Sequence, residues 1–118
     1  MNVEELRNYC LSLKCSTEEF PFDDVNMVLK VKGKMFALIP LDNPETQISL
    51  KCEPERAIQL REEFEAISPA WHFNKKHWNT VKIDPSISQK FLCELINHSY
   101  DLVVAGLARK LKEEMDLI

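Results

Sequence analysis

The amino-acid sequence predicts a single α+β domain over residues 1–118, built as two layers with helices on one face of a mainly antiparallel sheet. Two observations lead to this fold class. The spacing of apolar residues is helical near both ends of the chain, and it changes to a period of two in consecutive stretches between them. The resulting element order is α-β-β-β-α-β-β-α, which leaves the second sheet face to solvent or to a partner.

The first predicted helix covers residues 3–13. Apolar side chains recur there at intervals of three and four, and Asn2 and Glu5 have the spacing of a capping box. The following residues, 15–24, hold four acidic side chains and place Pro21 between two phenylalanines. We expect this segment to be an ordered connection without secondary structure of its own.

Three strands should follow as an antiparallel meander. In residues 25–31, one face of the strand carries Val25, Met27, Leu29 and Val31. The other carries Asn26, Val28 and Lys30, and we expect it to face solvent. Gly33 suits a tight turn into a second strand at 35–39, and prolines separate that strand from a third at 47–51.

A short helix over 54–65, opened by Pro54, should lead into a second hairpin. Its strands would be residues 70–73 and 78–83, joined by the basic stretch 74–77. A capping box from Ser86 to Gln89 then predicts the start of one last helix. Its apolar stripe runs from Ile87 to Leu111.

Composition narrows the possible functions. The chain has 118 residues and a formal net charge of −4, and a chain of this length buries enough surface to fold without a metal or a disulfide. Its acidic start and short apolar runs predict a soluble, cytoplasmic protein without a membrane partner, present as a monomer or a weak dimer. Four cysteines without CxxC spacing are expected to be reduced, mostly buried thiols.

Catalytic signatures are absent from the sequence. It has neither a GxSxG nor an HExxH pattern, and its two glycines cannot form a phosphate-binding loop. We therefore expect a protein that is not an enzyme, with no catalytic residue, no metal ligand and no cofactor. Weaker alternatives are a metal held by His72 and His77, and a nucleophilic pair of Cys93 and His98.

Charge placement points to residues 66–83. This window has no acidic residue and a net charge of +3, whereas the rest of the chain carries −7. Its lysines and histidines alternate with tryptophan and asparagine, which suits phosphate contact combined with stacking. If Val81 points inward, then Trp78, Thr80 and Lys82 point outward. Lys30 and Lys51 could join them on that face.

Two interpretations of this window stay open. Tryptophans usually pack in cores, and a lysine-rich hairpin is first a soluble turn, so its use could be structural. The same outward face could instead bind a partner. The acidic residues between 18 and 24 are most simply a solvated connection.

The motif Pro69-x-x-His72-x-Asn74-Lys75-x-His77-Trp78-x-Thr80-Val81 resembles the MmcQ/YjbR family. The resemblance extends from the first helix to Leu111 and includes Leu50-Lys51, Pro54-Glu55 and Ser99-Tyr100-x-Leu102-Val103. It implies a DUF419-type small domain with a fold similar to bacterial frataxin (CyaY). It also implies binding of double-stranded DNA through a double-wing arrangement of hairpins, with Lys75 and His77 suited to phosphate contact.

Two functions follow as hypotheses. The first is binding of double-stranded DNA by a basic hairpin and the adjoining sheet face. The second is a protein-interaction module that uses the exposed sheet face around Trp78. The candidate nucleic-acid-binding residues are His72, Asn74, Lys75, Lys76, His77, Trp78, Thr80, Lys82, Lys51 and Lys30.

Overall fold

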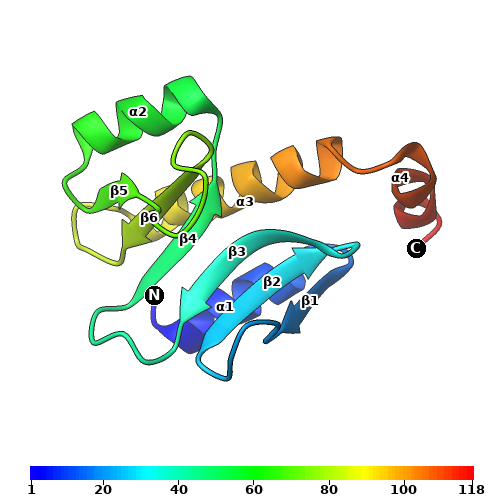
Figure 1. The fold of residues 1–118 in the computed structure, drawn as a ribbon, viewed down its shortest axis with the longest axis horizontal. Coiled ribbons are helices and arrows are strands. Elements are labelled where there is room, and N and C mark those ends of the chain that lie inside the picture. Colours follow the sequence, from blue (N-terminus) through cyan, green and yellow to red (C-terminus); the bar gives the residue numbers. More distant parts are fainter.

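A computed structural model describes residues 1–118 as an α+β fold with one six-stranded sheet (Figure 1). The sheet order is β1-β2-β3-β4-β6-β5, and every neighbouring pair is antiparallel. The elements are α1 (Val3–Ser12), β1 (Ser16–Glu19), β2 (Asn26–Val31), β3 (Lys34–Pro40), β4 (Gln47–Lys51), α2 (Pro54–Glu63), β5 (Ile67–Pro69), β6 (Trp78–Lys82), α3 (Gln89–Ala105) and α4 (Arg109–Asp116).

Helices α1 and α3 cover one face of the sheet and lie behind it in Figure 1. The core lies between them and the sheet, where Leu6 of α1 and Ile96 of α3 pack in one cluster with Leu29, Ile39 and Ile48. The opposite face carries no helix. We call it the open face.

The α1 start agrees with the sequence prediction. Asn2 accepts a hydrogen bond from the Glu5 backbone, and the Glu5 carboxylate accepts one from the Asn2 backbone, so the capping box is complete. Satisfying these free N–H groups sets the first residue of the helix.

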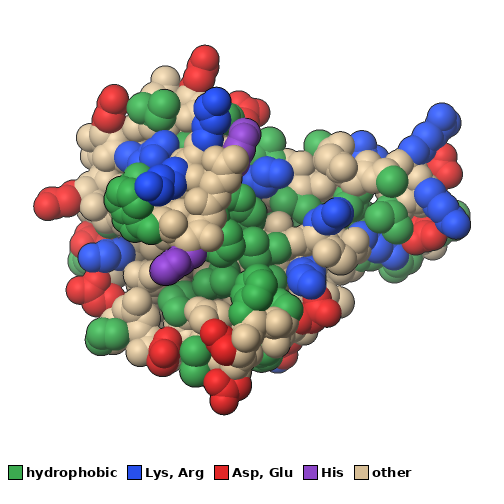
Figure 2. All heavy atoms as spheres, viewed as in Figure 1, with side chains coloured by type: hydrophobic (Ala, Val, Ile, Leu, Met, Phe, Trp, Pro, Cys, Tyr) green, Lys and Arg blue, Asp and Glu red, His purple; other side chains and the backbone are tan.

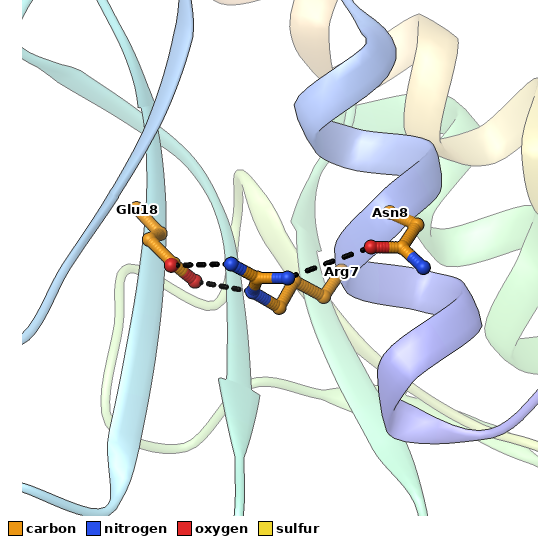
Figure 3. Close-up of polar contacts among 3 residues, drawn as sticks. All are labelled: Arg7, Asn8 and Glu18. Atoms are coloured by element: carbon orange, nitrogen blue, oxygen red, sulfur yellow. Dashed lines mark hydrogen bonds and ion pairs between the residues drawn. The ribbon is translucent and has the colours of Figure 1, made fainter.

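The prediction that residues 15–24 lack secondary structure was wrong, because β1 forms there as an edge strand beside β2. Its sequence, Ser-Thr-Glu-Glu, has no apolar side chain and includes two glutamates, which strands disfavour, so the ladder to β2 and an anchor to α1 decide its structure. Figure 3 shows the anchor: Arg7 Nε and Nη2 donate to the two Glu18 carboxylate oxygens at 2.6 and 2.7 Å. A further Arg7 contact reaches Asn8 Oδ1 at 3.5 Å. The Arg7 hydrogen bond lowers the pKa of Glu18.

Val28 also departs from the prediction. It lies on the open face, as its alternation with Met27 and Leu29 requires, yet it is fully buried. Strand β2 is an inner strand, and its neighbours across from Val28 are Glu19 and Leu38. The alternation of residues along a strand shows on which face of the sheet a side chain lies. Whether water reaches that side chain depends on the neighbouring strands.

The second hairpin begins earlier than predicted. Strand β5 is Ile67–Pro69, and residues 70–77 form a loop between it and β6. The predicted strand at 70–73 fails because the loop residues hydrogen-bond among themselves, as described below.

The last helix differs at both ends from the prediction. Ser88, not Ser86, caps α3 by accepting from the Phe91 backbone, and the Ser86 N–H donates to Asp84 in a turn. Helix α3 ends at Ala105 with Gly106 as its C-cap, and α4 follows as a separate helix. Glu114 of α4 pairs with Lys32 in the β2–β3 turn at 3.6 Å.

Ser99 of α3 connects the two halves of the sheet. Strands β3 and β4 pair only at Ala37 with Leu50 and at Leu38 with Ser49. A bulge in β3 beside Phe36 also shifts its register against β2. Beyond this short ladder, the buried Ser99 hydroxyl donates to the Phe36 carbonyl and accepts from the Lys51 N–H at 2.8 Å. One side chain thus satisfies a backbone group on each strand.

All four cysteines are free thiols. Cys10 lies in the core, where burial raises the pKa of its thiol to about 12, because an apolar environment disfavours the thiolate. Burial also raises the pKa of Cys52.

The longest helix, α3, has 17 residues, and no helix in the structure combines the length and apolar character needed to cross a membrane.

Substitution Ser99→Ala should lower the free energy of unfolding by about 2 kcal/mol or more, because each unsatisfied buried polar group costs about 1–3 kcal/mol. Urea unfolding followed by circular dichroism measures this change. Ser12→Ala, at an exposed serine in α1, is the control and should change stability by less than about 0.5 kcal/mol. Equal stability of the two variants would contradict the bridging role of Ser99.

Alkylation should separate the thiols by burial. In the folded protein at mildly alkaline pH, iodoacetamide should leave Cys10 unmodified, because it is inaccessible and protonated, while the partly exposed Cys15 reacts. Mass spectrometry of peptides gives the modified fraction at each site, and all four thiols should react in denaturant. Labelling of Cys10 as fast as Cys15 in the folded protein would place Cys10 outside the core.

Candidate nucleic-acid interface

The loop 70–77 is ordered by its own backbone. The Phe73 N–H donates to the Ala70 carbonyl at 3.0 Å, and the His77 N–H donates to the Asn74 carbonyl at 3.0 Å, so two turns follow one another. The Asn74 side chain accepts from the Lys76 N–H at 3.0 Å, which is the Asx-turn geometry that asparagine favours. Asn74 therefore shapes the turn that presents Lys75 and Lys76.

The two tryptophans have different environments. Trp78 of β6 is half-buried and stacks on Phe73, with ring centroids 5.0 Å apart. Trp71 is 67% exposed, and the Lys75 ammonium lies 4.1 Å from its ring centroid. This is cation–π geometry. The ring available for a ligand is thus Trp71, which the candidate set omits, because the sequence shows both rings in the window but not which one reaches solvent.

The lysines of the candidate set differ in whether a carboxylate compensates their charge. The pairing registers place Lys30, Lys51 and Lys82 on the open face with Trp78 and Thr80. Lys30 pairs with Glu19 at 3.0 Å, and Lys82 pairs with Glu45 at 3.1 Å. Lys51, Lys75 and Lys76 have no carboxylate within 4.0 Å, so the uncompensated positive charge lies around the loop.

Other motif residues hold the hairpin in place. The Thr80 hydroxyl is 2.9 Å from the Ser49 hydroxyl on β4, and the His77 carbonyl accepts from the Cys52 N–H at 2.7 Å. Asn79, a buried residue between two motif positions, donates to the Ala57 carbonyl of α2 at 3.3 Å. His72 is exposed on the loop. These contacts give His77 and Thr80 structural roles that their residue types did not indicate.

Residues named in the weaker sequence hypotheses make other contacts in the structure. His98 Nε2 accepts from the Glu53 N–H at 3.4 Å at the start of α2, and burial lowers the pKa of His98. The Asp23 carboxylate accepts hydrogen bonds from the Val25 backbone N–H and from the backbone and side-chain N–H groups of Asn26. These contacts order the connection before β2. No three His, Cys, Asp or Glu side chains are grouped as metal ligands would be.

A groove of about 420 Å³ lies between the loop and the open face. Leu38, Ser49 and Thr80 of the sheet line it, and Trp71 and Phe73 border it from the loop. Figure 2 views this side of the molecule: hydrophobic side chains gather over the centre of the sheet, lysine and arginine side chains stand around them, and acidic side chains lie mainly at the periphery.

Comparison with known proteins identifies relatives of this chain. The family model described as YjbR matches residues 11–102. The chain is 37% identical to the uncharacterized protein YbdF of Escherichia coli O157:H7 over 91 residues, which are 77% of this chain and 75% of YbdF. It is 31% identical to the uncharacterized protein YjbR of Escherichia coli K12, over 88% of each chain.

Solved structures share the fold. A Deinococcus radiodurans protein with a DUF419 domain superposes with a TM-score of 0.90 at 39% identity, covering 98% of this chain and 88% of that one. A Pseudomonas syringae protein gives a TM-score of 0.75 at 27% identity, covering 86% of this chain and 98% of its own. The family model, the relatives and the shared fold agree with the motif of the β5–β6 hairpin, and the chain therefore belongs to the YjbR family.

Proposed function

We propose that this protein is a non-enzymatic nucleic-acid-binding domain that contacts the phosphate backbone through the loop 70–77. The supporting observation is the arrangement of the loop: it presents Lys75 and Lys76 without a carboxylate partner and Trp71 as an exposed ring beside them. Lysines neutralise phosphates, and an aromatic ring adds a surface for stacking.

The distribution of charge favours a local contact. The chain carries a net charge of −4, which repels a polyanion at long range, while the window 66–83 carries +3. Glu19 and Glu45 compensate Lys30 and Lys82, so these two lysines contribute little free charge. Binding is therefore expected to be weak at physiological salt and to strengthen as salt is lowered.

A protein-interaction module is the second candidate. The observation that favours it is the set of apolar side chains over the centre of the open face (Figure 2). The exposed Trp71 lines the groove on that face. Aromatic anchors bordered by polar residues are typical of protein interfaces.

Removing both free loop lysines tests DNA binding. Lys75→Ala with Lys76→Ala should lower the affinity for duplex DNA and reduce the slope of log affinity against log salt by about two, because each phosphate contact contributes about 0.9. Fluorescence anisotropy titrations at several salt concentrations give the slope. Lys90→Ala with Lys110→Ala, at exposed positions in α3 and α4, changes the net charge equally and should leave the slope unchanged. An unchanged slope in the loop variant would exclude these phosphate contacts.

The second candidate has its own test. Immobilised wild-type protein should retain a protein partner from nuclease-treated lysate, and Trp71→Ala should lose that partner by removing the exposed anchor. Ile58→Ala, which removes an exposed apolar side chain from α2, is the control and should retain it. If Trp71→Ala retains every partner, the open face near Trp71 is not the interface.

A further inference from the structure

The groove beside the loop has aromatic side chains from two separate elements. Trp71 and Phe73 come from the β5–β6 loop, and Phe22, which is 68% exposed, comes from the connection between β1 and β2. Leu38 and Pro40 of β3 also line the groove. Such apolar surfaces accept the flat faces of a planar ring.

Free hydrogen-bonding groups line the same groove. The Gln47 side chain makes no hydrogen bond within the protein, so its amide offers both a donor and an acceptor. Asn26 uses its amino group on Asp23 and keeps its carbonyl oxygen, and Asn43 uses its carbonyl oxygen on the Glu45 N–H and keeps its amino group. Side-chain amides of this kind recognise the edges of nucleobases.

The charges around the groove select among planar ligands. No Asp, Glu, Lys or Arg lines it, and His72 is the one ionisable side chain in its lining, which favours a neutral ring over a charged one. At its border the Lys75 ammonium lies over the Trp71 ring, and Lys76 follows with no carboxylate partner. A neutral ring in the groove with an attached phosphate near these lysines is the arrangement of a nucleotide.

We propose that the groove takes an unstacked base of a single-stranded nucleic acid while Lys75 and Lys76 contact its phosphates. This inference rests on the proposed nucleic-acid function and names the form of nucleic acid that the site recognises. The bases of an intact duplex are stacked on both faces and paired along their edges, whereas a base of a single strand can leave its stack and enter a groove. A volume of about 420 Å³ is within the range of small-molecule sites.

The test compares fluorescein-labelled single strands, DNA and RNA of one sequence, with the DNA duplex of that sequence at low salt. Wild-type protein should bind at least one single strand more tightly than the duplex. Trp71→Ala should weaken that binding about tenfold by removing a stacking surface. Gln47→Leu should weaken it about fivefold or more by removing the amide that contacts the base edge. Neither variant should change duplex affinity by as much.

Gln59→Leu is the matched control for Gln47→Leu, because Gln59 is exposed on α2, away from the groove, and it should bind like wild type. Circular dichroism checks that each variant folds, and Trp71→Ala changes only an exposed loop side chain. Tighter binding of the duplex, or unchanged single-strand affinity in both groove variants, would overturn the inference. If the variant with Lys75→Ala and Lys76→Ala still lost duplex affinity, the proposed nucleic-acid function would stand while the single-strand inference failed. If wild type bound none of the three probes, both proposals would fail.

Discussion

The junction between the two halves of the sheet depends on the hydrogen bonds of the Ser99 hydroxyl. Strands β3 and β4 pair at only two positions, and this short ladder is the direct link between β1-β2-β3 and β4-β6-β5. The Ser99 side chain extends the link by accepting from β4 and donating to β3, within a site that water does not reach. Since α3 supplies it, the helix layer also sets how the two halves of the sheet join, and with them the position of the β5–β6 hairpin.

The neighbour of Ser99 strengthens this junction. The Tyr100 ring packs edge-on against Phe36 at the bulge of β3, and its hydroxyl donates to the Lys14 carbonyl before β1. Two adjacent residues of α3 therefore contact three strands or their ends. The family motif residues Ser99 and Tyr100 have a structural explanation in these contacts.

The hairpin motif combines structural and presenting roles. Asn74 shapes the turn, Trp78 packs on Phe73, and Thr80 meets Ser49 across the strands. Their combined effect is to hold Trp71, Lys75 and Lys76 outward beside the groove. A rigid frame of this kind lowers the conformational entropy lost when a ligand binds.

The sequence alone predicts the α+β class, the capped first helix, the meander and the second strand of the basic hairpin, because capping and alternation depend on near neighbours in the chain. It could not predict β1, which forms through its ladder to β2 and the Arg7 anchor, or the burial of Val28 between neighbouring strands. It also located the basic window, but it did not show that Glu19 compensates Lys30, that Glu45 compensates Lys82, or that Trp71 is the exposed ring. These features arise in the folded protein, because each depends on side chains brought together from distant parts of the chain.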